Sequence, residues 1–145
     1  KASPDPVRDP GCNAGMVSVR ASEFGLVIVS DQPHVFLMQS ELYNTVYGGR
    51  HADDRFALLT NAFDARQRRN GWLEAVLLPP GGASGFTEAE EYGLVRYQFL
   101  AELEPGSFGY SDVAWTDRTV VVVYESEGGL KQVSLSAGEI RQRVV

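Results

Sequence analysis

The amino-acid sequence predicts an all-β fold, and three observations support this. Apolar segments of about 5 to 7 residues alternate with turn signals along the chain. No stretch has the long amphipathic pattern of a helix. Residues 119–125 form a β-branched run of the kind that prefers a buried sheet. With 15 glycines, 7 prolines and 43% hydrophobic residues in 145, the chain fits one globular β-rich unit rather than a disordered segment.

Several function classes are disfavoured by composition. The formal net charge of -6 argues against a nucleic-acid partner, although it leaves room for a local cationic pocket. No apolar run approaches the ~20 residues of a membrane span. His34 and His51 have no ligand spacing around them, so we expect no metal and no cofactor. The single cysteine, Cys12, is interpreted as a small buried residue or as a link to another chain.

The strands are expected in a simple order along the chain. Residues 34–51 are interpreted as a connecting loop, and residues 87–91 as the start of a short helix. Residues 108–113 and 119–125 form a hairpin, with a tight turn at Asp117-Arg118. The remaining strands are predicted at residues 12–19, 26–29, 55–60, 72–78 and 97–103, with turns at 23–25 and 79–82.

Tyr110 is the residue on which a functional prediction depends. It lies between two small residues, Gly109 and Ser111, so another molecule could approach its hydroxyl closely. A tyrosine at the start of a strand is structural more often than catalytic. The surrounding sequence favours a functional role for Tyr110. The order is Tyr110-Ser111-Asp112-Val113, a short Asp-containing turn, a strand and then Tyr124-Glu125. This order resembles the last blade of the sialidase family.

Two further stretches carry the resemblance. Residues 12–33 are similar to the family's Cys-x-Gly-Ser, strand, turn, strand pattern, with one shifted small residue. Arg55-Phe56-Ala57-Leu58 resembles the Arg-x-x-Leu that begins a strand in the family. The resemblance implies antiparallel four-stranded blades and the C-terminal part of a six-bladed β-propeller. It divides the chain into one blade (12–63), an insertion (64–96) and the final blade (97–145). Since blades take roughly 40–50 residues, a second chain or segment is expected to carry the earlier ones.

The resemblance also implies an exo-α-sialidase that hydrolyses or transfers the terminal sialic acid of a glycan. A phenol suits a substrate with a carboxylate at the anomeric carbon, because a carboxylate nucleophile would be repelled. Tyr110 would be the nucleophile. Arg55 would be the third arginine that holds the sugar carboxylate, Asn13 a sugar contact and Glu125 a buried carboxylate that orients another arginine. The family's catalytic glutamate and aspartate have no match in this chain.

Other interpretations remain open. Arg55 could be a surface arginine paired with Asp53 or Asp54, and Asp112 a turn residue. Arg66, Arg68 and Arg69 are interpreted as a solvated turn. The whole chain could be a catalytically inactive sialidase-fold module that binds glycans or proteins, or an unrelated β-domain used for assembly. A sialidase would be expected outside the cell, at its surface, or in lysosomes or vesicles.

Overall fold

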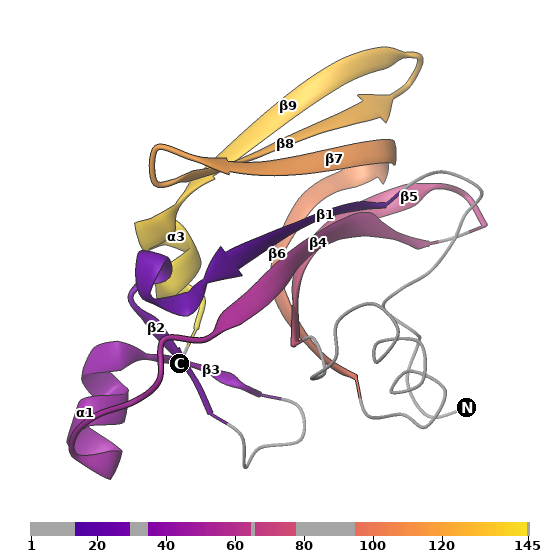
Figure 1. The fold of residues 1–145 in the computed structure, drawn as a ribbon. Helices are drawn as coiled ribbons and strands as arrows, with labels where there is room; N and C mark the ends of the chain where they lie inside the picture. Colours follow the sequence, from indigo (N-terminus) through magenta and orange to yellow (C-terminus); the bar gives the residue numbers. More distant parts are fainter. Residues whose placement is uncertain (1–13, 30–34, 65, 78–94, 145) are drawn as a thin grey trace.

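A computed structural model describes residues 14–29, 35–64, 66–77 and 95–144. Two antiparallel sheets lie face to face, with a short hairpin and helices at one end (Figure 1). Sheet A has the strand order β1-β4-β5-β6, and sheet C the order β7-β8-β9. Most described residues are in strands, so the all-β prediction is confirmed.

Sheet A is a three-strand meander with an added edge strand. The meander consists of β4 (Arg55–Asp64), β5 (Arg69–Leu77) and β6 (Arg96–Ser107), and β1 (Gly15–Arg20) pairs antiparallel with β4. β5 therefore lies inside the sheet, although it belongs to the stretch that the sequence sets apart as an insertion.

Sheet C continues directly from β6. It is a meander of β7 (Gly109–Thr116), β8 (Thr119–Ser126) and β9 (Gly129–Ser136). Asp117 and Arg118 both have positive φ, 48° and 60°, as the twist of a two-residue hairpin requires. The predicted hairpin and its turn are thus confirmed.

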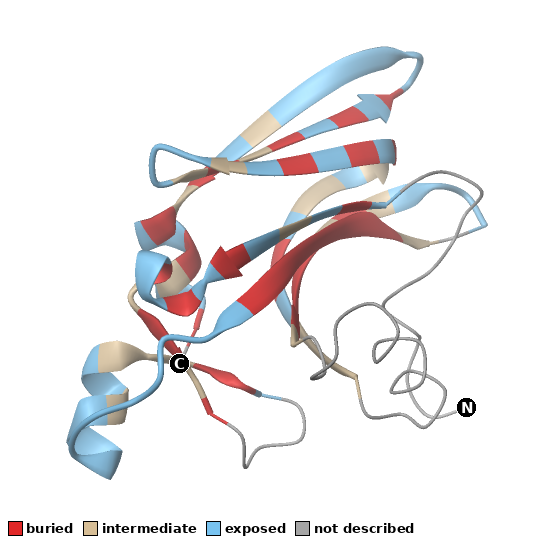
Figure 2. Ribbon diagram, in the orientation of Figure 1, coloured by how far each residue is buried: buried red, intermediate tan, exposed pale blue. Residues whose placement is uncertain are grey.

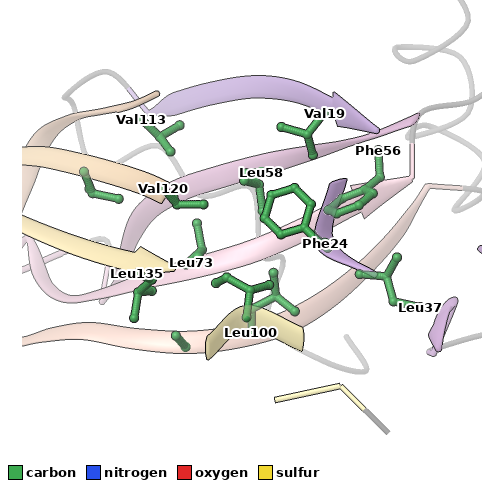
Figure 3. Close-up of a cluster of buried hydrophobic side chains, with 14 of the residues drawn as sticks. Val19, Phe24, Leu37, Phe56, Leu58, Leu73, Leu100, Val113, Val120 and Leu135 are labelled. Atoms are coloured by element: carbon green, nitrogen blue, oxygen red, sulfur yellow. The ribbon is translucent and has the colours of Figure 1, made fainter. Parts of the chain in front are cut away.

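The hydrophobic core fills the space between the two sheets (Figures 2 and 3). Alternating residues of each strand point into it, as the two-residue period of a strand dictates. Sheet A contributes Val19, Phe56, Leu58, Leu73 and Leu100, and sheet C contributes Val113, Val120, Val122 and Leu135.

The edges of the two sheets meet where β1 runs beside β7. A Cβ atom at Gly15 would lie 2.6 Å from Thr60 Oγ1 and 2.8 Å from the Asp112 Cα, so glycine permits this approach. On the same edge the hydroxyls of Thr60 and Ser111 are hydrogen-bonded, 3.0 Å apart. These contacts fix the residue that follows Tyr110 against sheet A.

One end of the core is closed by short elements. They are the 3₁₀ helix η1 (Ala21–Phe24), the β2–β3 hairpin (Leu26–Ile28 and Leu37–Gln39) and α3 (Ala137–Gln142), which buries Ile140. Helix α1 (Ser40–Tyr47) projects beside them (Figure 1). The predicted loop over 34–51 was wrong for residues 37–47, because β3 and α1 lie there. Tertiary pairing with β2 creates β3, and that partner cannot be read from local composition.

The larger assembly stays a prediction. Within the described residues the sheets do not close into a ring. The expected helix start at 87–91 and the turn at 79–82 lie outside those residues.

Candidate functional site

Phe108 anchors the junction between the two sheets. Its side chain is 1% exposed and stacks on the ring of Tyr124, with the centroids 4.6 Å apart. A Cβ atom at Gly71 would collide with the Phe108 ring, so β5 can pass there only with glycine. The Phe108 amide donates a 2.7 Å hydrogen bond to the carbonyl oxygen of Arg68, in the turn between β4 and β5. The start of β7, directly after Phe108, is therefore held in place against the β4–β5 turn.

Tyr110 has an unusual backbone conformation two residues later. Its φ is 46°, in the left-handed region that side chains other than glycine rarely adopt. The register of β7 against β8 is interrupted between Gly109 and Asp112, where β7 holds one residue more than β8. Such bulges turn a side chain out of the regular strand pattern and occur often beside active sites. The Tyr110 side chain accordingly stays half exposed, whereas Ser111 is buried.

The Tyr110 side chain borders a surface hollow of about 210 Å³. The other walls come from residues 67–68 of the β4–β5 turn, residues 107–109 of the sheet junction, and Glu125, Glu127 and Gly128 at the end of β8. Three separate turns of the chain thus meet here, which places the hollow where the two sheets join.

The hollow combines a phenol, a guanidinium and two carboxylates. The Arg68 guanidinium carbon lies 5.5 Å from the centre of the Tyr110 ring, within the range of a cation–π interaction. Glu125 is the ladder partner of Gly109, directly before Tyr110, and it is exposed. A phenol beside these charges can act as a nucleophile or bind a polar ligand by hydrogen bonds.

Arg55 is not brought to this hollow. It begins β4, opposite Arg20, and its guanidinium donates hydrogen bonds to Ser18 Oγ (3.0 Å) and to the Ser18 carbonyl oxygen (3.2 Å). Thr60, which contacts Ser111 beside Tyr110, is five residues further along β4. At about 3.3 Å per residue, that separation is roughly 17 Å.

The carboxylate beside Arg55 has other partners. Asp53 accepts hydrogen bonds from the hydroxyl and the amide of Ser22 (2.8 and 3.2 Å), and it lies 3.7 Å from Arg20. The Ser22 hydroxyl is the main cause that lowers the Asp53 pKa. Arg55 therefore does not pair with Asp53, as the alternative interpretation expected. Arg55 is hydrogen-bonded to Ser18, and Asp53 forms an ion pair with Arg20.

The remaining site residues divide as follows. Asn13 lies outside the described residues. Glu125 was expected to be buried, and this was wrong, because Val122 and Tyr124 point inward and Glu125 takes the outward position between them and Ser126. Asp112 accepts a hydrogen bond from the Val113 amide (2.9 Å), as expected of a residue that supports a strand start.

A polar cluster supports the junction from the core side. Glu104 Oε1 accepts hydrogen bonds from the Tyr124 hydroxyl (3.0 Å) and the Lys131 ammonium (3.2 Å), and its Oε2 accepts one from the Gly106 amide (3.1 Å). The Gly106 amide in particular lowers the Glu104 pKa. Burial and the Glu104 carboxylate raise the pKa of Tyr124 to about 12. Tyr124 is therefore a neutral hydrogen-bond donor that joins β6 to β8.

Arg68 is the site residue that sequence reasoning missed. Its cluster with Arg66 and Arg69 was interpreted as a solvated turn, and these residues are indeed exposed. The contact with Tyr110 depends on how the β4–β5 turn packs against the sheet junction, 42 residues along the chain. No local signal in the sequence carries that information.

No protein-family model, curated protein or solved structure matches this chain. The resemblance to sialidases therefore rests on the short motifs around Tyr110, Arg55 and residues 12–33. In the part of the chain that the structure describes, no helix has both the length and the apolar character needed to cross a membrane.

Proposed function

We propose that this chain is part of an exo-α-sialidase that hydrolyses or transfers terminal sialic acid through Tyr110 as nucleophile. The observation that carries the proposal is the placement of Tyr110. It is a half-exposed phenol on a bulge, with positive φ, at a hollow that also holds a guanidinium and two carboxylates. Strained residues of this kind cluster at functional sites.

The chemistry follows from the ligand's charge. Sialic acid carries a carboxylate on its anomeric carbon, which disfavours a second carboxylate as the attacking group. A neutral phenol avoids that repulsion and forms a glycosyl–tyrosine bond once a base takes its proton. The hollow, at about 210 Å³, is smaller than the ~300 Å³ lower end of ordinary ligand pockets. It therefore suits the reacting end of one sugar, with the rest of the glycan outside it.

The proposal includes a second chain or segment, because the acid/base aspartate and the base glutamate expected of a sialidase have no match here. Residues 12–63 and 97–145 would form blades of the complete propeller, and Glu125 would orient an arginine of the companion.

Arg55 and Asn13 are proposed as sugar contacts of that assembly. Because the sugar carboxylate lies on the carbon that Tyr110 attacks, Arg55 binds it only if the assembly closes the separation of roughly 17 Å between the start of β4 and the hollow. The present contacts of Arg55 with Ser18 do not serve this role, so the variant Arg55→Gln tests it separately. A raised KM in the assembly would support Arg55 as a carboxylate-binding residue. An unchanged KM would remove it from the site.

Turnover of a fluorogenic sialoside by the complete assembly tests the function. Tyr110→Phe removes only the phenol oxygen and is expected to abolish turnover. Tyr47→Phe, at an exposed tyrosine of α1, is the matched control and should keep full turnover. Equal turnover in both variants would end the nucleophile assignment. The isolated 145-residue chain is expected to be inactive.

A second candidate is a glycan-binding module without catalysis. Three aromatic rings from adjacent strands of sheet A favour it. Phe63 stacks on Trp72 (4.0 Å between centroids), Trp72 meets Phe99 edge-on (4.6 Å), and Phe99 is 48% exposed. Phe99 is the exposed ring of the three, and an exposed aromatic ring offers an apolar surface to the face of a sugar. Titration with sialyllactose of the parent chain and of the variants Phe99→Ala and Leu130→Ala tests this second candidate. Binding that is lost in Phe99→Ala and kept in Leu130→Ala supports the glycan-binding module.

A further inference from the structure

Arg68 and Tyr110 both line the hollow, the Arg68 guanidinium lies over the Tyr110 ring, and both residues have positive φ, 52° and 46°. Left-handed backbone at a side chain other than glycine persists only where surrounding contacts hold it. Arg68 adopts it in the β4–β5 turn, and Tyr110 adopts it at the bulge of β7. Each conformation is set by its own local structure, and the two residues meet where the β4–β5 turn packs against the sheet junction.

The backbone of the same two segments is also tied together. The Phe108 amide donates to the Arg68 carbonyl oxygen at 2.7 Å, and Phe108 itself is locked against Gly71 and Tyr124. Arg68 therefore has little freedom to move relative to the start of β7. Its guanidinium is placed over the Tyr110 ring by the main chain and not only by its own side-chain torsions.

The charges around the hollow make this placement consequential. Among the described residues that line the hollow, Arg68 is the one cationic side chain, beside the carboxylates of Glu125 and Glu127. A guanidinium over the ring is attracted to the π-face and opposes the two negative charges near the phenol. Loss of that cation would leave the half-exposed ring without the contact that selects its orientation.

We infer that Arg68 is the positioning residue of Tyr110: the β4–β5 turn holds the guanidinium over the phenol ring and so keeps the hydroxyl directed at the hollow. This inference rests on the proposed function for its catalytic consequence, but the positioning itself does not require catalysis. It assigns a role in the site to Arg68, which the sequence pattern predicts to be part of a solvated turn.

Fluorine NMR of the full chain tests the positioning directly. With 3-fluorotyrosine incorporated, the Tyr110 resonance is identified by its loss in Tyr110→Phe. We expect one sharp Tyr110 resonance in the parent protein and in Arg66→Gln, the matched control from the same turn. In Arg68→Gln it should move toward the chemical shift of 3-fluorotyrosine in the unfolded chain, because an exposed ring that samples several orientations is averaged within nanoseconds, and Arg68→Lys should restore part of the parent shift. An unchanged Tyr110 resonance in Arg68→Gln would overturn the inference.

Kinetics of the complete assembly test the consequence. Arg68→Gln is expected to lower kcat about two- to fivefold, the range that an exposed cation–π contact supports, with KM little changed. A raised KM at unchanged kcat would instead make Arg68 a substrate-binding residue and overturn the positioning role. If no variant or parent shows turnover, the proposed function fails, while the NMR result still decides whether Arg68 positions Tyr110.

Discussion

The hydroxyl of Ser111 donates a hydrogen bond to the carbonyl oxygen of Thr60 (3.1 Å) and accepts one from the Thr60 hydroxyl (3.0 Å). Both residues are buried, and they belong to different sheets. This reciprocal pair fixes β7 to β4 immediately after Tyr110. The position of the candidate nucleophile therefore depends on a polar contact inside the protein.

Ser111→Ala is expected to lower the free energy of unfolding by about 1–3 kcal/mol, because it leaves buried Thr60 groups without their partner. Denaturant unfolding measures the change. Ser134→Ala, at an exposed serine of β9, is the control and should stay within about 0.5 kcal/mol of the parent. A similar small effect for Ser111→Ala would mean that water replaces the serine.

Gly71→Ala is expected to destabilise the protein by about 1–3 kcal/mol, since the new methyl group would overlap the Phe108 ring and that ring is enclosed. Gly138→Ala in α3 is the matched control, because the nearest atom to its new methyl is 3.9 Å away. A helix gains about 0.5–1 kcal/mol from alanine in place of glycine. Thermal unfolding of both variants should therefore shift in opposite directions.

Glu104→Gln is expected to weaken the dependence of stability on acidic pH. The Glu104 pKa is lowered in the folded protein, so its carboxylate contributes stability above the unfolded pKa. That contribution is lost as the pH falls from about 4.3 through the lower folded value. Unfolding curves measured between neutral and acidic pH should fall less steeply in Glu104→Gln. Parallel curves for parent and variant would contradict the prediction.

Tyr124→Phe is expected to remove an alkaline loss of stability. Tyr124 has a folded pKa of about 12 against about 10 in an unfolded chain. The folded state holds this proton more tightly, so the contribution is complete below pH ~10 and decreases as the pH rises toward 12. Tyr47→Phe should retain the parent's alkaline decline. The prediction fails if Tyr124→Phe declines in the same way.

Tyr110→Asn is expected to stabilise the fold by up to about 1 kcal/mol, because asparagine adopts positive φ more readily than tyrosine. Asp112→Asn, in the same strand, is the control for the introduction of an amide. Chemical unfolding measures both variants. A destabilised Tyr110→Asn would show that the ring's contacts outweigh its backbone strain.

The strands of sheet C could be predicted from the sequence, because their signals are local. The β-branched run, the Asp117-Arg118 turn and the period of alternation specify β7 and β8 without reference to other segments. Residues 72–78 were likewise predicted as a strand, and β5 covers residues 69–77. The pairing of β1 with β4 and the α1 helix required tertiary information, as did the packing of the two sheets.

The candidate site was predictable in part. Tyr110 was identified by its small neighbours and the surrounding motif, and the structure places it with Glu125 at one hollow. The burial of Glu125 was misjudged because residues 119–124 are apolar or β-branched throughout, so composition alone does not tell inward from outward positions. Arg68 was missed because a charged turn gives the same local pattern whether or not another segment packs against it.

The hydrogen bond between the Phe108 amide and the Arg68 carbonyl has a consequence for how this chain can change over evolutionary time. Hairpin tips ordinarily tolerate added or deleted residues. Here a change in the length of the β4–β5 turn would displace the Arg68 guanidinium and, through the Phe108–Arg68 hydrogen bond, the start of β7. The tip should therefore keep its length among descendants that keep the tyrosine, while its side chains other than Arg68 vary.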